Sequence, residues 1–128
     1  MHTVKLCPCE SKKPYSVCCE PYHNGIAAPT AEALMRSRYT AFALGLEEYL
    51  LQTWHPETRP STLNLAEDAA TKWLGLQVKN TANISEKKAT VEFVARYKIA
   101  GKAERLHELS EFERIEGRWY YLVGSDPR

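Results

Sequence analysis

The 128-residue chain has no cysteine beyond residue 19, no long apolar run and almost no net charge. A formal charge of +1 gives no general attraction to nucleic acid or to an anionic membrane, so neither is expected as a specific partner. No apolar segment approaches the roughly 18 residues of a membrane-spanning helix. Residues 1–6 lack the apolar core of a secretory signal, which favours a cytoplasmic protein. The sequence also lacks internal repeats, a phosphate-cradling glycine loop and a recognisable nucleophile–base arrangement.

What the chain does have is a cluster of four cysteines at its start, in the order Cys7-Pro8-Cys9 and, eight residues later, Cys18-Cys19. A tetrahedral zinc site needs four soft ligands on one small polyhedron. Pro8, with its fixed φ, suits the turn that lets the first pair converge, and the second pair can reach one metal only at a tight turn or helix end. Four thiolates would leave the ion no open position for water or substrate. The sequence therefore predicts one structural Zn²⁺.

Two disulfides are the main alternative for the four sulfurs, because four cysteines allow about three pairings. A Cys18–Cys19 bridge is disfavoured, since adjacent Cα atoms lie about 3.8 Å apart and bridges prefer about 4.4–6.8 Å. Bridges from the first pair to the second stay open, as does thiol redox chemistry, which predicts exposed thiols of low pKa. His23 is either a substitute for one thiolate or a surface histidine beside Tyr22.

Apolar spacings of three and four residues predict helices after the cysteine cluster. Thr30 is the expected N-cap, and Glu32 suits the positive end of the helix dipole. Gly45 should separate a helix ending near residue 44 from another over about residues 46–54, which His55-Pro56 ends. A third, shorter helix is expected over residues 60–72.

After Trp73 the apolar period changes to two. The alternating residues are Leu74, Leu76 and Val78, then Val91, Phe93, Ala95, Tyr97 and Ile99. Two further strands are expected over residues 104–115 and 119–123, with turns at Gly101 and Gly117. Helices followed by an antiparallel meander define an α+β fold, here about three helices packed on a curved four-stranded antiparallel sheet.

Several segments resemble known families. The run Cys7-Pro8-Cys9 … Lys13-Pro14-Tyr15 … Cys18-Cys19-Glu20-Pro21-Tyr22-His23-Asn24-Gly25 resembles the SEC-C motif, the short zinc-binding element at the C-terminus of the SecA preprotein translocase. Residues 31–42, 53–56, 72–76 and the stretch from 93 to 108 resemble the YchJ-like family of small bacterial proteins.

These resemblances imply a SEC-C-like zinc-binding motif over residues 1–25 and a nuclear transport factor 2-like (cystatin-like) α+β domain over residues 26–128. The implied metal ligands are Cys7, Cys9, Cys18 and Cys19. The motif usually carries glycine where this chain has Glu10 and Lys12, so a positive φ at either position would be strained.

Five residues are candidates for lining a cavity in the body: Trp54, His55, Trp73, Tyr97 and His107. Further candidate polar groups are Glu57, Asp68, Arg96, Glu108 and Ser110. Strand alternation places His107 and Glu108 on opposite faces, so the two cannot form a simple acid–base dyad. No catalytic residue is assigned.

Basic residues near the cysteines have two interpretations. Arg36 and Arg38 are expected on a solvated face or as ion-pair partners. Together with the lysines at positions 5, 12 and 13 they would alternatively form a basic docking surface.

We therefore interpret the chain as a cytoplasmic accessory or adaptor protein rather than an enzyme. The zinc head would dock onto a protein partner, and the SEC-C resemblance suggests a chaperone or the ribosome. The cavity domain would act as a scaffold or small-ligand binder. The enzyme alternative, an isomerase or dehydratase of the kind found in this fold, predicts a deep cavity with two converging polar groups and a shifted pKa.

Overall fold

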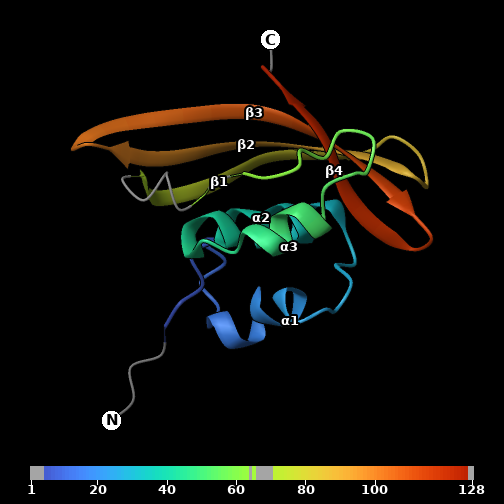
Figure 1. Cartoon of the computed structure of the whole chain (residues 1–128), viewed down its shortest axis with the longest axis horizontal. Coiled ribbons are helices and arrows are strands. Elements are labelled where there is room, and N and C mark those ends of the chain that lie inside the picture. Colours follow the sequence, from blue (N-terminus) through green and yellow to red (C-terminus); the bar gives the residue numbers. More distant parts are fainter. Residues whose placement is uncertain (1–4, 64, 66–70, 127–128) are drawn as a thin grey trace.

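The computed structural model describes residues 5–63, 65 and 71–126. The helical elements are η1 (Tyr15–Val17), α1 (Glu20–His23), α2 (Ala31–Leu44) and α3 (Glu47–Gln52), and the strands are β1 (Thr71–Asn83), β2 (Lys88–Ile99), β3 (Lys102–Ile115) and β4 (Arg118–Ser125). Figure 1 shows three layers: the sheet, then α2 and α3, then the N-terminal segment with α1. The predicted α+β fold with a four-stranded antiparallel sheet is confirmed.

Helix α2 begins and ends where the sequence predicts. The Thr30 side chain accepts a hydrogen bond from the Ala33 N–H at 3.0 Å, which satisfies one of the unpaired donors of the first turn. Gly45 ends the helix with a φ of 76°, a left-handed conformation that suits glycine. The chain then starts α3, which ends at Gln52, two residues before the expected boundary.

The sheet is a meander in the order β1-β2-β3-β4. The turns at Ala100-Gly101 and Glu116-Gly117 place all four residues at positive φ, between 49° and 83°. Two-residue turns of this kind match the right-handed twist of the strands they join. Both predicted hairpins are confirmed.

Strand β1 departs from simple alternation. A register shift lies between Trp73 and Gly75, and a second lies between Val78 and Asn80. Leu74 is 50% exposed whereas Leu76 is 7% exposed, so the expectation that they share a face is wrong. The extra residue reverses the side-chain alternation, and Trp73 instead packs on α2, with its ring centroid 5.7 Å from that of Tyr39.

The expected third helix over residues 60–72 is wrong at its C-terminal end, since Thr71 and Lys72 belong to β1. Residues 61–63 are not helical. The remainder of that segment, residues 64 and 66–70 including the candidate Asp68, lies outside the described residues.

The cysteine-bearing segment packs on the body through one continuous hydrophobic cluster. Cys9 and Cys19 are 0% and 1% exposed, and they share this cluster with Leu34 and Tyr39 of α2. Helix α2 therefore lies between the cysteines and the sheet (Figure 1). The domain boundary between residues 25 and 26 stays a prediction. None of the helices in the described part of the chain has the length and apolarity of a membrane span.

Candidate functional site

The four cysteine sulfurs lie within 4.8 Å of one another. The Sγ atom of Cys18 is 3.6 Å from that of Cys9 and 3.9 Å from that of Cys19. A tetrahedron with Zn–S bonds of about 2.3 Å has S···S edges of about 3.8 Å, so these spacings suit a tetrahedral ion. A disulfide needs about 2.0 Å, and all four cysteines are free thiols. The four sulfurs are therefore placed so that they could hold one metal ion.

A short antiparallel ribbon brings the first cysteine pair into place. The Cys7 N–H donates to the Lys13 carbonyl at 2.8 Å, and the chain reverses direction between them. Glu10 and Lys12 adopt φ values of 67° and 68° in this reversal, where glycine would be unstrained. The positive φ expected at these two positions is therefore present.

The second cysteine pair lies where one short helix ends and the next begins. Cys18 is the C-cap residue of η1 and Cys19 is the N-cap residue of α1. This change of backbone direction lets two adjacent side chains converge, as the sequence requires.

Helix α2 contributes a hydrogen-bond donor and a positive charge to one side of the cysteine cluster. Thr40 donates to the Cys19 Sγ at 3.4 Å, and the Arg36 guanidinium donates to the Cys9 carbonyl at 2.8 Å. Arg36 also pairs with Glu32 at 3.0 Å, as expected. Hydroxyl donors to metal-bound thiolates orient them and tune the site. A cationic side chain beside the cluster offsets the net charge of about −2 that four thiolates leave on a divalent ion.

The thiols do not ionise alike. Hydrogen bonds with Cys19 and Cys7 lower the pKa of Cys9, whereas hydrogen bonds with Cys7 and Cys9 raise the pKa of Cys19. Burial raises the pKa of Cys18. Only Cys18 is not fully buried, which weighs against a role in redox exchange with other proteins.

His23 joins the cysteine-bearing segment to α2. Its Nε2 atom is 2.8 Å from the Ser37 carbonyl, which can only accept, so Nε2 carries the proton. Its Nδ1 atom then accepts from the Tyr15 hydroxyl at 2.7 Å. Burial lowers the pKa of His23, in keeping with a neutral ring. His23 is thus half-buried with both nitrogens engaged, and it lies outside the cysteine cluster.

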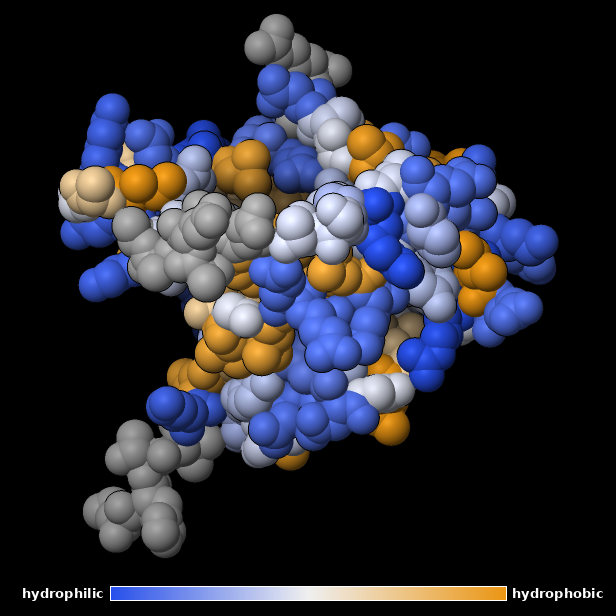
Figure 2. Space-filling view, in the orientation of Figure 1, coloured by the Kyte–Doolittle hydropathy of each residue, from blue (hydrophilic) through white to orange (hydrophobic). Residues whose placement is uncertain are grey.

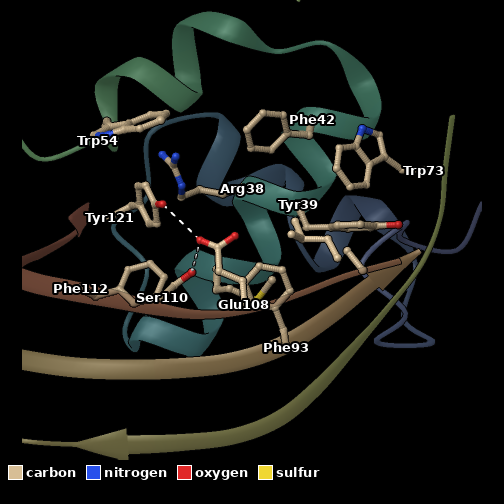
Figure 3. Close-up of a pocket in the computed structure, with 13 residues that line it drawn as sticks. Arg38, Tyr39, Phe42, Trp54, Trp73, Phe93, Glu108, Ser110, Phe112 and Tyr121 are labelled. Atoms are coloured by element: carbon tan, nitrogen blue, oxygen red, sulfur yellow. Dashed lines mark hydrogen bonds between the residues drawn. The ribbon is translucent and has the colours of Figure 1, made fainter. Parts of the chain in front are cut away.

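A second site is a pocket of about 160 Å³ between the helices and the sheet (Figure 3). Trp54 and Trp73, both sequence candidates, lie in its wall with Phe42 and Phe93. His55, Tyr97 and His107 are not among the described residues that line it. The walls are mostly aromatic, and the tryptophans border the space without filling it.

The three other candidates lie elsewhere for identifiable reasons. His55 is 5% exposed at the end of the α3 segment, where its Nδ1 accepts the Glu57 N–H at 3.0 Å. His107 points away from the pocket because strand alternation turns it to the outer face, where it lies 2.7 Å from Glu92. Tyr97 packs against the Trp73 ring at 5.3 Å.

Glu108 points into the pocket from β3, on the face opposite His107 as expected. Its Oε1 atom accepts hydrogen bonds from the Ser110 and Tyr121 hydroxyls, each at 3.3 Å. Burial raises the pKa of Glu108, and burial also raises the pKa of Tyr121 to about 12. A Cβ at Gly124 would overlap the Glu108 carboxylate, so the absent side chain makes room for this arrangement.

Arg38 forms the opposite side of the pocket, and the expectation that it is solvated is wrong. It is 5% exposed, with its guanidinium carbon 5.1 Å from the Trp54 ring and 4.7 Å from the Tyr121 ring. Its Nη1 atom donates to the Leu50 carbonyl at 2.7 Å. Burial lowers the pKa of Arg38 to about 10, which leaves it charged at neutral pH. The sequence spacing could have indicated this burial, because Arg38 lies three residues after Met35 and four before Phe42 and so falls on the apolar stripe of α2.

Comparisons with known proteins agree with this architecture. Residues 30–124 match the family model described as YchJ, middle NTF2-like domain. The chain is similar to a UPF0225 protein of Chromobacterium violaceum, with 58% identity over 123 residues, covering 92% of this chain and 90% of that protein.

Two solved structures share the whole fold. One is the solution structure of RPA3114, a SEC-C motif containing protein from Rhodopseudomonas palustris, with a TM-score of 0.87, 36% identity, and coverage of 97% of this chain and 100% of that one. The other is the crystal structure of a SEC-C motif containing protein from Psychrobacter arcticus, with a TM-score of 0.80, 32% identity, and coverage of 97% and 85%. The chain therefore belongs to the YchJ-like family, in which a SEC-C-type cysteine cluster accompanies a nuclear transport factor 2-like domain.

Proposed function

We propose that this chain is a cytoplasmic adaptor in which a structural Zn²⁺ shapes the head, defined as residues 5–25, and the head docks onto a protein partner. The four-cysteine cluster carries the proposal, because its S···S spacings suit zinc and four thiolates saturate the ion. A saturated ion supports structure rather than turnover. The body serves as a scaffold and binds a small ligand in its pocket.

The outer side of the head supports a docking role. Leu6 and Val17 are 61% and 66% exposed, although the cysteines of the same segment are packed on α2. Lys12 and Lys13, which lie between them in sequence, are also exposed. Apolar side chains flanked by lysines suit a partner with an apolar patch and an acidic rim. By analogy with the SEC-C motif of the translocase, that partner is a chaperone or the ribosome.

A capture experiment with matched variants tests the docking role. Zinc-loaded wild-type protein, Cys18→Ser and Val17→Asp are compared with Ile84→Asp, which alters a residue 65% exposed in the turn after β1. We expect a partner that binds wild type and Ile84→Asp and is lost from both head variants. Identical partners for all four proteins would remove the docking role. Native mass spectrometry of the same samples tests the metal separately.

Catalysis in the pocket is a second candidate, favoured by Glu108. Its carboxyl has a raised pKa and two converging hydroxyls, as the isomerase-like alternative requires. A carboxylate in such a site can remove a proton from a carbon next to a carbonyl and return it. The test is deuterium uptake from D₂O into cyclohexanone, followed by NMR. Uptake that is faster with wild type than with Glu108→Gln supports catalysis, and equal rates oppose it.

A further inference from the structure

The pocket holds one permanent cation and one acidic group within an otherwise aromatic wall. Arg38 comes from α2 and Glu108 from β3, and Figure 3 shows them facing the same space. Arg38 opposes the binding of an ammonium group, and Glu108 opposes the binding of a carboxylate. Because the walls carry one charge of each sign, the charge pattern favours a ligand with no net charge, and the mostly aromatic lining favours a neutral one over a zwitterion.

The carboxyl of Glu108 offers one open position. Its Oε1 atom takes the hydrogen bonds from Ser110 and Tyr121. No hydrogen bond from the described residues reaches Oε2, and this atom is not among the buried atoms that lack a partner. In Figure 3 the second carboxylate oxygen points toward the side of the pocket formed by Phe42 and Trp73. It is therefore available to a ligand.

The size and walls of the pocket limit the ligand to a single ring. A volume of about 160 Å³ is close to the ~150 Å³ of an engineered apolar cavity that binds benzene. The Phe42 and Trp73 ring centroids lie 5.9 Å apart at a tilt of 47°, and Phe93 lines the same space from β2. The two rings contact each other at a tilt, and with Phe93 they form an aromatic wall against which a flat apolar body can pack.

From these features we propose that the pocket binds a neutral, single-ring molecule with one hydroxyl group, the ring lying against Phe42, Trp73 and Phe93 and the hydroxyl bonding to Glu108 Oε2. This proposal rests on the small-ligand binding assigned to the body above. A hydroxyl both donates and accepts, so it satisfies Glu108 whether the carboxyl is ionised or protonated. A bare hydrocarbon ring would leave Oε2 unpaired on closing the pocket.

Phenol is the probe that tests the proposal, with toluene as the comparison of equal size and benzoate and benzylammonium as the slightly larger charged comparisons. Each is titrated into zinc-loaded, full-length protein, and the indole N–H signals of the three tryptophans are followed by NMR. Trp54 and Trp73 line the pocket whereas Trp119 does not. We expect saturable shifts at Trp54 and Trp73, and about tenfold tighter binding of phenol than of toluene, the size of one hydrogen bond to a charged group.

Two variants separate the hydroxyl contact from simple ring burial. Glu108→Leu should bind phenol and toluene with nearly equal affinity. Glu111→Leu is its matched control, because Glu111 is exposed on the other face of the same strand, and it should keep the wild-type preference. Loss of the preference in both variants would contradict the assignment to Glu108.

The remaining outcomes distinguish the ligand class from ligand binding itself. Tighter binding of benzoate or benzylammonium than of phenol overturns the neutral-hydroxyl class but leaves a small-ligand role for the body. Phenol shifts confined to Trp119 place binding elsewhere and also overturn it. If none of the four probes gives saturable shifts up to its solubility limit, both this inference and the small-ligand role fail.

Discussion

The hydroxyl oxygen of Thr40 lies 3.4 Å from the Cys19 sulfur and 3.6 Å from the Cys7 sulfur, so one side chain of α2 contacts both cysteine pairs. Thr40 is fully buried, which keeps water from taking its place. A donor held in this way favours thiolates over thiols at the cluster.

Replacing Thr40 with valine keeps the shape of the side chain and removes the donor. We expect Thr40→Val to fold and to bind Zn²⁺ about 10–100-fold more weakly, the usual cost of losing a partner of a metal ligand. Competition with a chromogenic chelator measures the affinity. Thr81→Val, at an exposed position of β1, is the matched control and should bind as wild type does. Equal affinities for both variants would show that the Thr40 contact is unimportant.

Removing the metal should disorder the head and leave the body folded. Structural zinc contributes roughly 10–16 kcal/mol of apparent binding energy in finger-type peptides, and a segment of this size has no core of its own. After chelation we expect amide protection to be lost over the head, residues 5–25, and kept in β2 and β3, whose Val91 and Phe112 are 0% and 2% exposed. Hydrogen exchange measures this, and added Zn²⁺ should restore protection. Thermal unfolding of the sheet that closely follows metal content would contradict the division.

The two left-handed residues of the cysteine loop predict a stabilising glycine. Lys12 has a φ of 68°, whereas its neighbour Lys13 is not at positive φ. A left-handed conformation costs a non-glycine residue about 1–2 kcal/mol, and part of this gain is offset because glycine loses more freedom on folding. Lys12→Gly should therefore stabilise the zinc-loaded head by about 1 kcal/mol. Lys13→Gly, which loses the same charge, should give no gain, and denaturant unfolding followed by the NMR signals of the head amides compares the two.

A methyl group at Gly124 should displace the Glu108 carboxyl. The Cβ of Gly124→Ala would overlap the Glu108 carboxylate, so the carboxyl must leave its bonds to Ser110 and Tyr121. We expect the carboxyl ¹³C signal of Glu108 and its titration midpoint to change, with little loss of secondary structure by circular dichroism. Ser125→Ala, at the next and exposed position, should leave both unchanged. An unaltered Glu108 titration in the alanine variant would mean that the backbone moves instead.

The raised pKa of Glu108 makes stability depend on pH in a defined direction. The folded protein binds this proton more tightly than the unfolded chain, so the contribution of Glu108 is most favourable below the ordinary pKa of 4.5 and declines as pH rises through the folded-state value. Glu108→Gln cannot ionise and should lack this decline, becoming more stable than wild type at neutral pH. Urea unfolding at a series of pH values above 4.5 measures the difference. Glu111→Gln serves as the control, and the same pH profile in both variants would assign the dependence to another group.

Local signals in the sequence were sufficient for much of this structure. Local backbone preferences of one or two residues do not depend on contacts with distant segments. They determine the N-cap at Thr30, the helix break at Gly45 and the glycine turns. The cysteine cluster was also predictable, because adjacent cysteines can share one ion only where the chain bends, and Cys18-Cys19 lie between two short helices. Likewise, strand alternation separated His107 from Glu108.

The parts that sequence reasoning missed depend on contacts between distant segments. The irregularity at Leu74 follows from how β1 pairs with β2, which no local pattern reveals. Arg38 can be buried because its guanidinium makes cation–π contacts with the rings of Trp54 and Tyr121, which come from two other segments. The space for the Glu108 carboxyl depends on Gly124, from the neighbouring strand.

Helix α2 is a single 14-residue helix with cysteines packed on one side and the pocket on the other. The cysteine cluster and the pocket contact neighbouring residues of this helix, because Thr40 contacts the sulfurs and the adjacent Tyr39 lines the pocket. Occupancy at either place should therefore be thermodynamically linked to occupancy at the other. The affinity of the pocket for a small molecule is therefore expected to differ between metal-stripped and metal-loaded protein, so a ligand screen should include both preparations.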